Sequence, residues 1–239
     1  MSRSFEDDAV LLRAVDYRDT DRILTLYLRE GGRISAIARG ARASKRRFGG
    51  SLQPFAKLRV EYSPGRDMAT LRGSTITKIN ESLLHKLSCI QSAGEGTGLV
   101  RDLCVDAEPE VQLFDAVVRF YEELGHGPDE EALTLAFMTR ALCVSGLAPG
   151  LDQCIVSGVR RPPGQAAYFD AIRGGIVRRE LLGGARTALA LSGSAIERIR
   201  ESMMESWVPE GSWSAGEHQQ IRRALTSFRE AHVKAPRSS

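Results

Sequence analysis

The sequence predicts an α+β protein of several domains, with a small closed β-barrel followed by a helical domain that carries an irregular insert. Three features of the chain lead to this prediction. Apolar and polar residues alternate over short stretches within residues 1–80, whereas from Glu81 onward apolar residues recur at helical spacing. Between residues 151 and 190 both patterns give way to a segment rich in glycine and proline, which indicates an irregular insert.

Short strands separated by polar turns are expected throughout residues 1–80. The first covers Ala9–Val15 and ends at a turn that contains Asp16, Asp19 and Asp21. Alternating apolar residues predict four further strands, over residues 23–28, 33–38, 57–62 and 68–79. Five strands in so few residues favour a barrel, because closure leaves no exposed strand edge.

The rest of the chain is expected to form a helical domain in two parts, residues 81–150 and 191–233. Apolar residues recur there every three or four positions, and glycines stand where several predicted helices end. The residues that set this spacing include Leu83, Leu87, Ile90, Val111, Phe114, Val117, Tyr121, Leu133, Phe137, Ala141, Ile196, Ile199, Met203, Ile221, Leu225 and Phe228. The insert covers residues 151–190, and residues 234–239 are expected to be a disordered tail.

Positive charge is concentrated near the start of the chain. The full sequence of 239 residues has a formal net charge of +3, yet residues 1–80 contain 16 basic and 9 acidic residues and carry +7. Residues 81–239 carry −4. The stretch Gly31–Val60 holds eight basic residues and no acidic one. Such a local field attracts polyanions, whatever the total charge of the protein.

The segment from Arg39 to Phe55 is the strongest candidate for a polyanion site. Five basic residues lie between Arg39 and Arg47, in a stretch that glycines make flexible. Cationic side chains on such a loop can follow a phosphate backbone, and each contact releases counterions. Phe48 offers a ring for stacking an unpaired base, although a core phenylalanine is the alternative. The predicted nucleic-acid site comprises Arg33, Arg39, Arg42, Lys45, Arg46, Arg47, Phe48, Lys57 and Arg59.

Several other classes of protein find little support in the sequence. No apolar run reaches 18 residues and the opening residues turn acidic at once, so neither a membrane span nor a secretory signal is expected. The four cysteines are spread too widely for a disulfide framework, which favours reduced thiols in a cytoplasmic protein. The stretch Gly94–Gly98 follows a helix rather than a strand, so no nucleotide-binding loop is expected there.

No catalytic constellation is recognisable, and the protein is expected not to be an enzyme. Two alternatives stay open. Asp16, Asp19 and Asp21 form a candidate metal cluster of the kind that a metal-dependent nuclease uses, although aspartates between strands more often serve the turn itself. The basic segment also suits an interaction scaffold that binds acidic peptides.

The order of these features resembles the RecO family of DNA repair proteins. The resemblance lies in Asp21-Arg-Ile-Leu-Thr-Leu, in Arg29-Glu-Gly-Gly-Arg-Ile-Ser-Ala-Ile-Ala-Arg-Gly-Ala-Arg42, in Lys45 and in Phe48-Gly-Gly-Ser-Leu-Gln-Pro-Phe55. It covers residues 9–80, and the rest of the chain agrees in layout only. The resemblance implies an OB-fold barrel whose DNA-contacting surface contains Arg33, Arg39, Arg42, Lys45, Arg46 and Arg47.

The same resemblance implies a function. Such a protein binds single- and double-stranded DNA, anneals complementary strands and helps RecA onto strands coated by single-strand-binding protein. DNA, RecR and the single-strand-binding protein are therefore the expected partners, with RecA acting downstream. No cofactor is expected.

The insert departs from the family pattern. Many relatives carry two Cys-x-x-Cys pairs there, which bind zinc, but this chain has Ser157 three residues after Cys154, and Arg178 and Leu181 in place of the second pair. One thiolate does not complete a tetrahedral site, so a zinc-finger-like insert without zinc is expected. The shape of the insert is then expected to depend on the packing of Ile155, Tyr168, Phe169 and Ile172.

Overall fold

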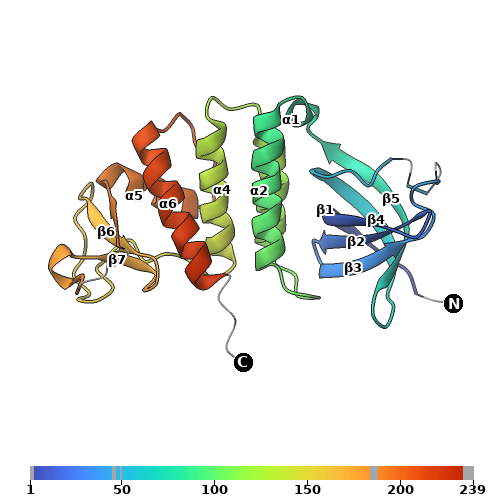
Figure 1. Cartoon of the computed structure of the whole chain (residues 1–239), viewed down its shortest axis with the longest axis horizontal. Helices are drawn as coiled ribbons and strands as arrows, with labels where there is room; N and C mark the ends of the chain where they lie inside the picture. Colours follow the sequence, from blue (N-terminus) through green and yellow to red (C-terminus); the bar gives the residue numbers. More distant parts are fainter. Residues whose placement is uncertain (1–2, 45–46, 49, 184–187, 234–239) are drawn as a thin grey trace. The chain divides into compact units, whose positions relative to one another are not determined.

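The computed structural model describes residues 3–44, 47–48, 50–183 and 188–233 (Figure 1). The chain divides into two compact units, Met1–His126 and Gly127–Ser239. Strands and helices occur in both, so the α+β class predicted from the sequence is confirmed. Of the helices in the described residues, none is long and apolar enough to cross a membrane.

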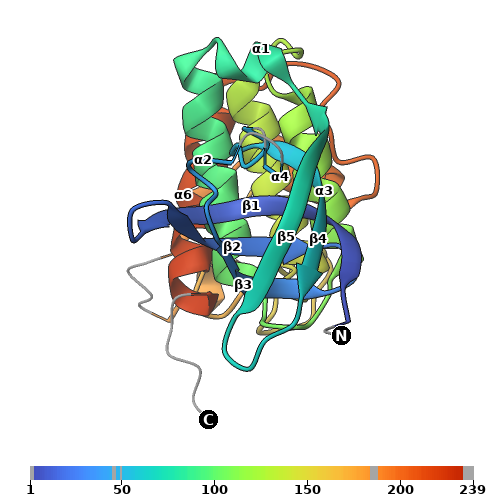
Figure 2. The same cartoon turned by 90° about the vertical axis from the view of Figure 1, so that its right-hand side faces the viewer.

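The first unit begins with strands that close into a barrel (Figure 2). They are β1 (Phe5–Tyr17), β2 (Asp21–Leu28), β3 (Gly32–Ala38), β4 (Ala56–Ser63) and β5 (Ala69–Ile79). Their order around the barrel is β1-β2-β3-β5-β4; β1 closes antiparallel on β4, and β3 pairs parallel with β5. Side chains from every strand fill the interior, among them Leu11, Leu26, Ala36, Leu58 and Leu71. The predicted barrel is confirmed.

The helices α1 (Glu81–Leu84), α2 (Leu87–Leu103) and α3 (Val111–Glu123) follow the barrel within the first unit. Asn80 caps α1, because its side-chain oxygen accepts a hydrogen bond from the Leu83 N–H. The Asn80 amide also donates to the carbonyl of Leu124, just past the end of α3, at 2.7 Å. The buried hydroxyl of Tyr27 on β2 donates to the Glu110 carbonyl at the start of α3, at 2.9 Å. The start of α3 is thus bonded to β2, and its end is bonded to the residue that follows β5.

The second unit packs α4 (Glu130–Val144) against α5 (Gly193–Met203) and α6 (Ala215–His232). Asp129 caps α4 by accepting from the Ala132 N–H, and its second oxygen lies 2.9 Å from the ring nitrogen of His218 on α6. The insert between α4 and α5 forms a sheet of strands in the order β7-β6-β8. These strands are β6 (Ala167–Asp170), β7 (Gly175–Val177) and β8 (Leu189–Leu191), with the short helix η1 (Arg179–Leu181) after β7.

The compact units group the helices differently from the predicted domains. The barrel ends at Ile79, next to the expected boundary, but α1, α2 and α3 belong to the same unit as the barrel. In contrast, α4 belongs to the second unit, although residues 81–150 were expected to form one part of the helical domain. The reason is packing across long chain separations, such as the ring contact between Tyr27 and Phe114 at 6.0 Å. The predicted tail, residues 234–239, lies outside the described residues.

The packing expected inside the insert is right for Phe169 and wrong for Ile172. Phe169 is buried and its ring lies 6.1 Å from that of Phe228 on α6. Ile172 is 68% exposed, because β6 ends at Asp170 and Ile172 falls in the turn before β7. Ile155 is also exposed and Tyr168 is half-buried. Leu151, Cys154, Ile176 and Val177 are buried instead and supply the core of the insert together with Phe169.

Replacing Tyr27 with phenylalanine tests the bond between the barrel and α3. The change removes one hydroxyl, so the Glu110 N–H loses its acceptor and the Glu110 carbonyl keeps only the bond from the Phe114 N–H. The free energy of unfolding should therefore fall by about 1–3 kcal/mol. Chemical denaturation of Tyr27→Phe and of the wild type measures this difference. Equal stability of the two proteins would contradict a role for this hydrogen bond.

Candidate nucleic-acid interface

Phe48 anchors the basic segment between β3 and β4 from inside the barrel. Its ring is 2% exposed and belongs to the barrel core, as does Leu52. Beside it, the Ser74 N–H on β5 donates to the Arg47 carbonyl at 3.2 Å, and the Ser51 hydroxyl donates to the Ser74 carbonyl at 3.0 Å. The expectation that Phe48 stacks on bases is therefore wrong. A ring enclosed by barrel side chains leaves no face for a base.

The start of the same segment is anchored to the turn between β1 and β2. The Gly40 N–H donates to the Asp21 carboxylate at 2.8 Å, and the Arg42 N–H donates to the Thr20 carbonyl at 3.0 Å. Gly40 has φ +66°, a conformation that glycine adopts without strain. The segment thus leaves β3 in a fixed direction and lies beside the β1–β2 turn.

The aspartates of this turn do not converge on one point. Asp21 accepts from Gly40, whereas Asp16 pairs with Arg22 at 2.9 Å and with Arg42 at 3.8 Å. At Asp19 it is the backbone carbonyl that accepts a bond from Arg42. In the described part of the chain no group of three or more His, Cys, Asp or Glu side chains is arranged to hold a metal ion. The geometry gives these aspartates the role of shaping the turn.

Arg39, Arg42 and Arg47 are exposed on the anchored segment. Arg47 donates to the Arg39 carbonyl at 2.9 Å, and its guanidinium lies 5.5 Å from the centre of the Phe48 ring. Because this acceptor is a neutral carbonyl, the bond itself does not neutralise the positive charge of Arg47. Lys45 and Arg46, also predicted to contact DNA, lie outside the described residues. Of the predicted site residues in this segment, the structure therefore describes Arg39, Arg42 and Arg47 as exposed.

The remaining predicted cations form ion pairs within the unit that are shorter than the 3.8 Å contact between Arg42 and Asp16. Arg33 binds Asp106 at 2.6 Å, and this hydrogen bond raises the pKa of Arg33 and lowers that of Asp106. Lys57 lies 2.8 Å from Asp8. Arg59 lies 3.3 Å from Glu6 and 3.4 Å from Asp8. Burial favours the protonated form of Asp8, but the bonds from Lys57 and Arg59 outweigh it and lower its pKa.

Two cations near the segment were missed by the sequence analysis. Arg13 and Arg18 are exposed on the β1–β2 hairpin, and the guanidinium of Arg18 lies 5.1 Å from the centre of the Tyr17 ring. Each is isolated along the chain among acidic or apolar neighbours, so no basic run marks it. The available signal was the turn that connects the first two predicted strands, since hairpin turns adjoin the binding faces of small barrels.

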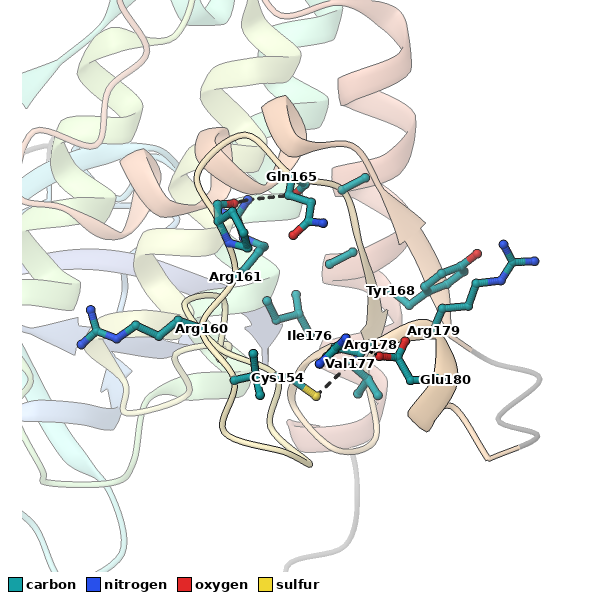
Figure 3. A pocket seen from close by; sticks show the side chains of 14 residues that line it. Cys154, Arg160, Arg161, Gln165, Tyr168, Ile176, Val177, Arg178, Arg179 and Glu180 are labelled. Carbon is teal, nitrogen blue, oxygen red and sulfur yellow. Dashed lines mark hydrogen bonds and ion pairs between the residues drawn. The ribbon is translucent and has the colours of Figure 1, made fainter.

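The residues of the insert do not fit a zinc site (Figure 3). Cys154 is buried, and its sulfur accepts a hydrogen bond from the Arg178 N–H at 3.5 Å. Burial opposes ionisation of this thiol, but hydrogen bonds from Ser157, Arg178 and Val156 outweigh it and lower the pKa of Cys154 to about 7. Backbone and hydroxyl donors therefore satisfy the sulfur in place of a metal ion.

A pocket of about 440 Å³ adjoins Cys154 in the insert. Figure 3 shows that two arginines of its wall, Arg160 and Arg179, point in opposite directions. A third, Arg178, pairs with Glu180 at 2.6 Å. The pocket therefore does not direct its positive charges toward one point, and it carries no argument for a catalytic site.

A buried arginine joins the insert to α5. The side chain of Arg161 is 5% exposed and donates to the Gln165 carbonyl at 2.8 Å and to the Leu151 carbonyl at 3.3 Å. It also pairs with Glu197 on α5, and this bond lowers the pKa of Glu197. Glu197 in turn binds Arg200, which lies 3.0 Å from Asp152. This network links both ends of the insert's first loop to the helical core.

Comparison with known proteins covers nearly the whole chain. Residues 1–80 match the family model for the N-terminal part of recombination protein O, and residues 83–239 match the model for its C-terminal part. The chain belongs to the RecO family. Its fold agrees with this assignment, because the first match ends where the barrel ends.

Individual RecO proteins support the same assignment. The DNA repair protein RecO of Anaeromyxobacter dehalogenans strain 2CP-C is 37% identical over 230 residues, which cover 94% of this chain and 89% of that protein. The RecO protein of Myxococcus xanthus is 36% identical over 197 residues, which cover 82% of this chain and 80% of that protein. The resemblance first found in residues 9–80 thus extends into the helices and the insert.

Phe48 is expected to support the barrel rather than contact DNA. Phe48→Ala should lower the free energy of unfolding by about 3–5 kcal/mol, because it leaves a cavity in the core. Phe48→Leu keeps most of the apolar volume and should bind an oligonucleotide as the wild type does. Denaturation and fluorescence anisotropy measure the two effects. A Phe48→Leu protein of full stability but weak binding would restore the stacking role.

Cys154 should titrate near pH 7 in the folded protein, and thiolate absorbance measures this directly. Because its folded pKa of about 7 lies below the ordinary value of 9.0, ionised Cys154 stabilises the fold above that ordinary value. This stabilisation is lost as the pH falls through about 7. Cys154→Ser should lack the transition, whereas Cys104, with a pKa raised by burial to about 11, should not contribute. A native midpoint at the ordinary value would contradict the hydrogen-bonded thiolate.

Proposed function

We propose that the first unit binds nucleic acid through the basic loop surface, defined as Arg39, Arg42, Lys45, Arg46 and Arg47. The observation that carries this proposal is the exposure of Arg39, Arg42 and Arg47 on a segment held at both ends by the barrel. A fixed array of guanidinium groups meets phosphates at a small cost in chain entropy.

In this proposal the protein is a recombination mediator that makes and breaks no covalent bond. It binds single- and double-stranded DNA and anneals complementary strands, because cations between two phosphate backbones reduce their mutual repulsion. It also helps RecA onto strands coated by single-strand-binding protein, with RecR as a partner. Membership of the RecO family supports these roles.

The alternatives drawn from the sequence gain less support. A metal-dependent nuclease needs carboxylates that face one ion, whereas Asp16 and Asp21 are engaged with different partners. A scaffold for acidic peptides uses the same positive field as DNA does, so competition decides between them. An acidic peptide of matched charge should displace DNA far less well than an oligonucleotide, since it lacks the closely spaced phosphates.

Replacing Arg39, Arg42 and Arg47 with alanine should weaken binding, because three cations that meet phosphates are removed. About five such cations give the wild type a slope near −4 in a plot of log affinity against log salt concentration, and removing three should flatten it by up to about 2.7 units for duplex DNA. Anisotropy titrations of labelled duplex and single strands at several salt concentrations measure the slope.

The paired cations provide the matched control for this experiment. Lys57→Ala removes the same charge from a residue that already binds Asp8, so it should change the slope by well under one unit. Thermal unfolding confirms that each variant is folded. If the triple variant has the same slope as the wild type, the DNA-binding surface lies elsewhere on the protein. If the wild-type protein binds no DNA at low salt, the proposal is wrong.

A further inference from the structure

A groove of about 740 Å³ lies in the first unit between the second half of β1 and the helix α2. Arg13 and Val15 line it from β1, Gly94, Gly98 and Arg101 line it from α2, and Arg22 lines it from β2. The strand β1 and the helix α2 are in contact within this unit. The groove is separate from the basic loop surface but lies in the same compact unit.

The edge of β1 along this groove is unpaired in the described residues. Phe5–Val10 of β1 pair with β4, whereas Arg13–Tyr17 pair with β2 on the other edge. The register shifts between Leu11 and Arg13, which is a β-bulge at the point where β1 leaves β4. After the bulge β1 stays paired with β2 only, so its second half presents an open edge beside the groove.

Two of the residues that line the groove from α2, Gly94 and Gly98, carry no side chain. Glycine is the least favourable helix residue after proline, so the three glycines in the middle of α2, of which Gly94 and Gly98 line the groove, need a reason. Close packing is not that reason, because a Cβ atom built on Gly94 or Gly98 meets no atom within 4 Å. The absence of side chains here keeps the groove open.

The groove combines positive charge with apolar surface. Arg13 and Arg101 are exposed at its walls, Val15 is 43% exposed, and the half-buried ring of Phe55 also lines it. The acidic residue of the groove, Asp16, is shared between Arg22 and Arg42. Since Arg42 belongs to the basic loop surface, this shared carboxylate marks where the groove adjoins that surface.

We propose that this groove holds one unpaired nucleic-acid strand that continues from the basic loop surface, and that it selects single strands over duplex. The inference rests on the proposed function. An unpaired strand can set its bases against Val15 and Phe55 while its phosphates meet Arg13 and Arg101. A duplex keeps its bases stacked inside, so it gains only the phosphate contacts of the exposed loop.

Filling the groove from α2 tests the proposal without changing any charge. Gly98→Leu should lower affinity for a short oligothymidylate on the order of tenfold, the effect of removing one base from its stacking position, while affinity for a hairpin duplex stays unchanged. Gly98→Ala should have a smaller effect. Ser88→Leu, an exposed position of α2 outside the groove lining, is the matched control and should bind both probes normally. Both glycine replacements favour the helix, so they should fold.

A second variant tests the charges of the groove. Arg13→Ala with Arg101→Ala should flatten the salt dependence of single-strand binding by about 1.4 units and leave that of duplex binding unchanged. The strand path would be overturned if the variants lost equal affinity for the single-stranded and duplex probes, or if Gly98→Leu lost affinity for neither. The open edge of β1 would then be a candidate site for an extended peptide instead.

The variant of Arg39, Arg42 and Arg47 separates this failure from that of the proposed function. If the triple arginine variant binds both the single-stranded and the duplex probe more weakly, while the groove variants bind both normally, the DNA-binding proposal stands and the groove proposal fails. If the wild type and this variant bind alike, the proposed function itself fails.

Discussion

Burial of Phe48 is the constraint on which the arrangement of the basic segment depends. The ring fills the barrel core, and the adjoining backbone bonds to Ser74 on β5. At the other end, Gly40 is held by Asp21. A segment that is basic and rich in glycine would otherwise sample many conformations, and ordering it on DNA would cost conformational entropy. Fixing both ends lets the arginines face solvent in a defined place while the core holds the aromatic side chain.

Neutralisation by neighbouring strands decides which cations remain available. The acidic residues Glu6 and Asp8 lie far before their partners Lys57 and Arg59 in the chain, yet β1 and β4 are adjacent in the barrel. Salt bridges of this kind contribute little to stability when exposed, typically about 0–1 kcal/mol. Their effect here is on the field of the barrel, because they neutralise positive charge on β4, whereas the β3–β4 segment contains no acidic residue.

The insert shows how a segment keeps its shape when metal ligands are missing. The sulfur of Cys154 accepts backbone and hydroxyl hydrogen bonds, and the buried guanidinium of Arg161 binds carbonyls of the loop and Glu197 of α5. A planar guanidinium with several donors can join several acceptors at once, which makes it a suitable substitute for a cross-link.

The sequence by itself determined the barrel, the helices after Glu81 and the basic segment, because alternation, helical spacing and charge are local properties of the chain. It also marked Cys154 as a thiol without the partners of a zinc site. Only the tertiary structure decided that Phe48 lies in the core, that Arg33, Lys57 and Arg59 are paired, and that α4 belongs to a different compact unit from α1–α3. Each of these outcomes depends on which strands and helices become neighbours. Burial and ion pairing are set by residues that meet in space, and their spacing along the chain does not reveal them.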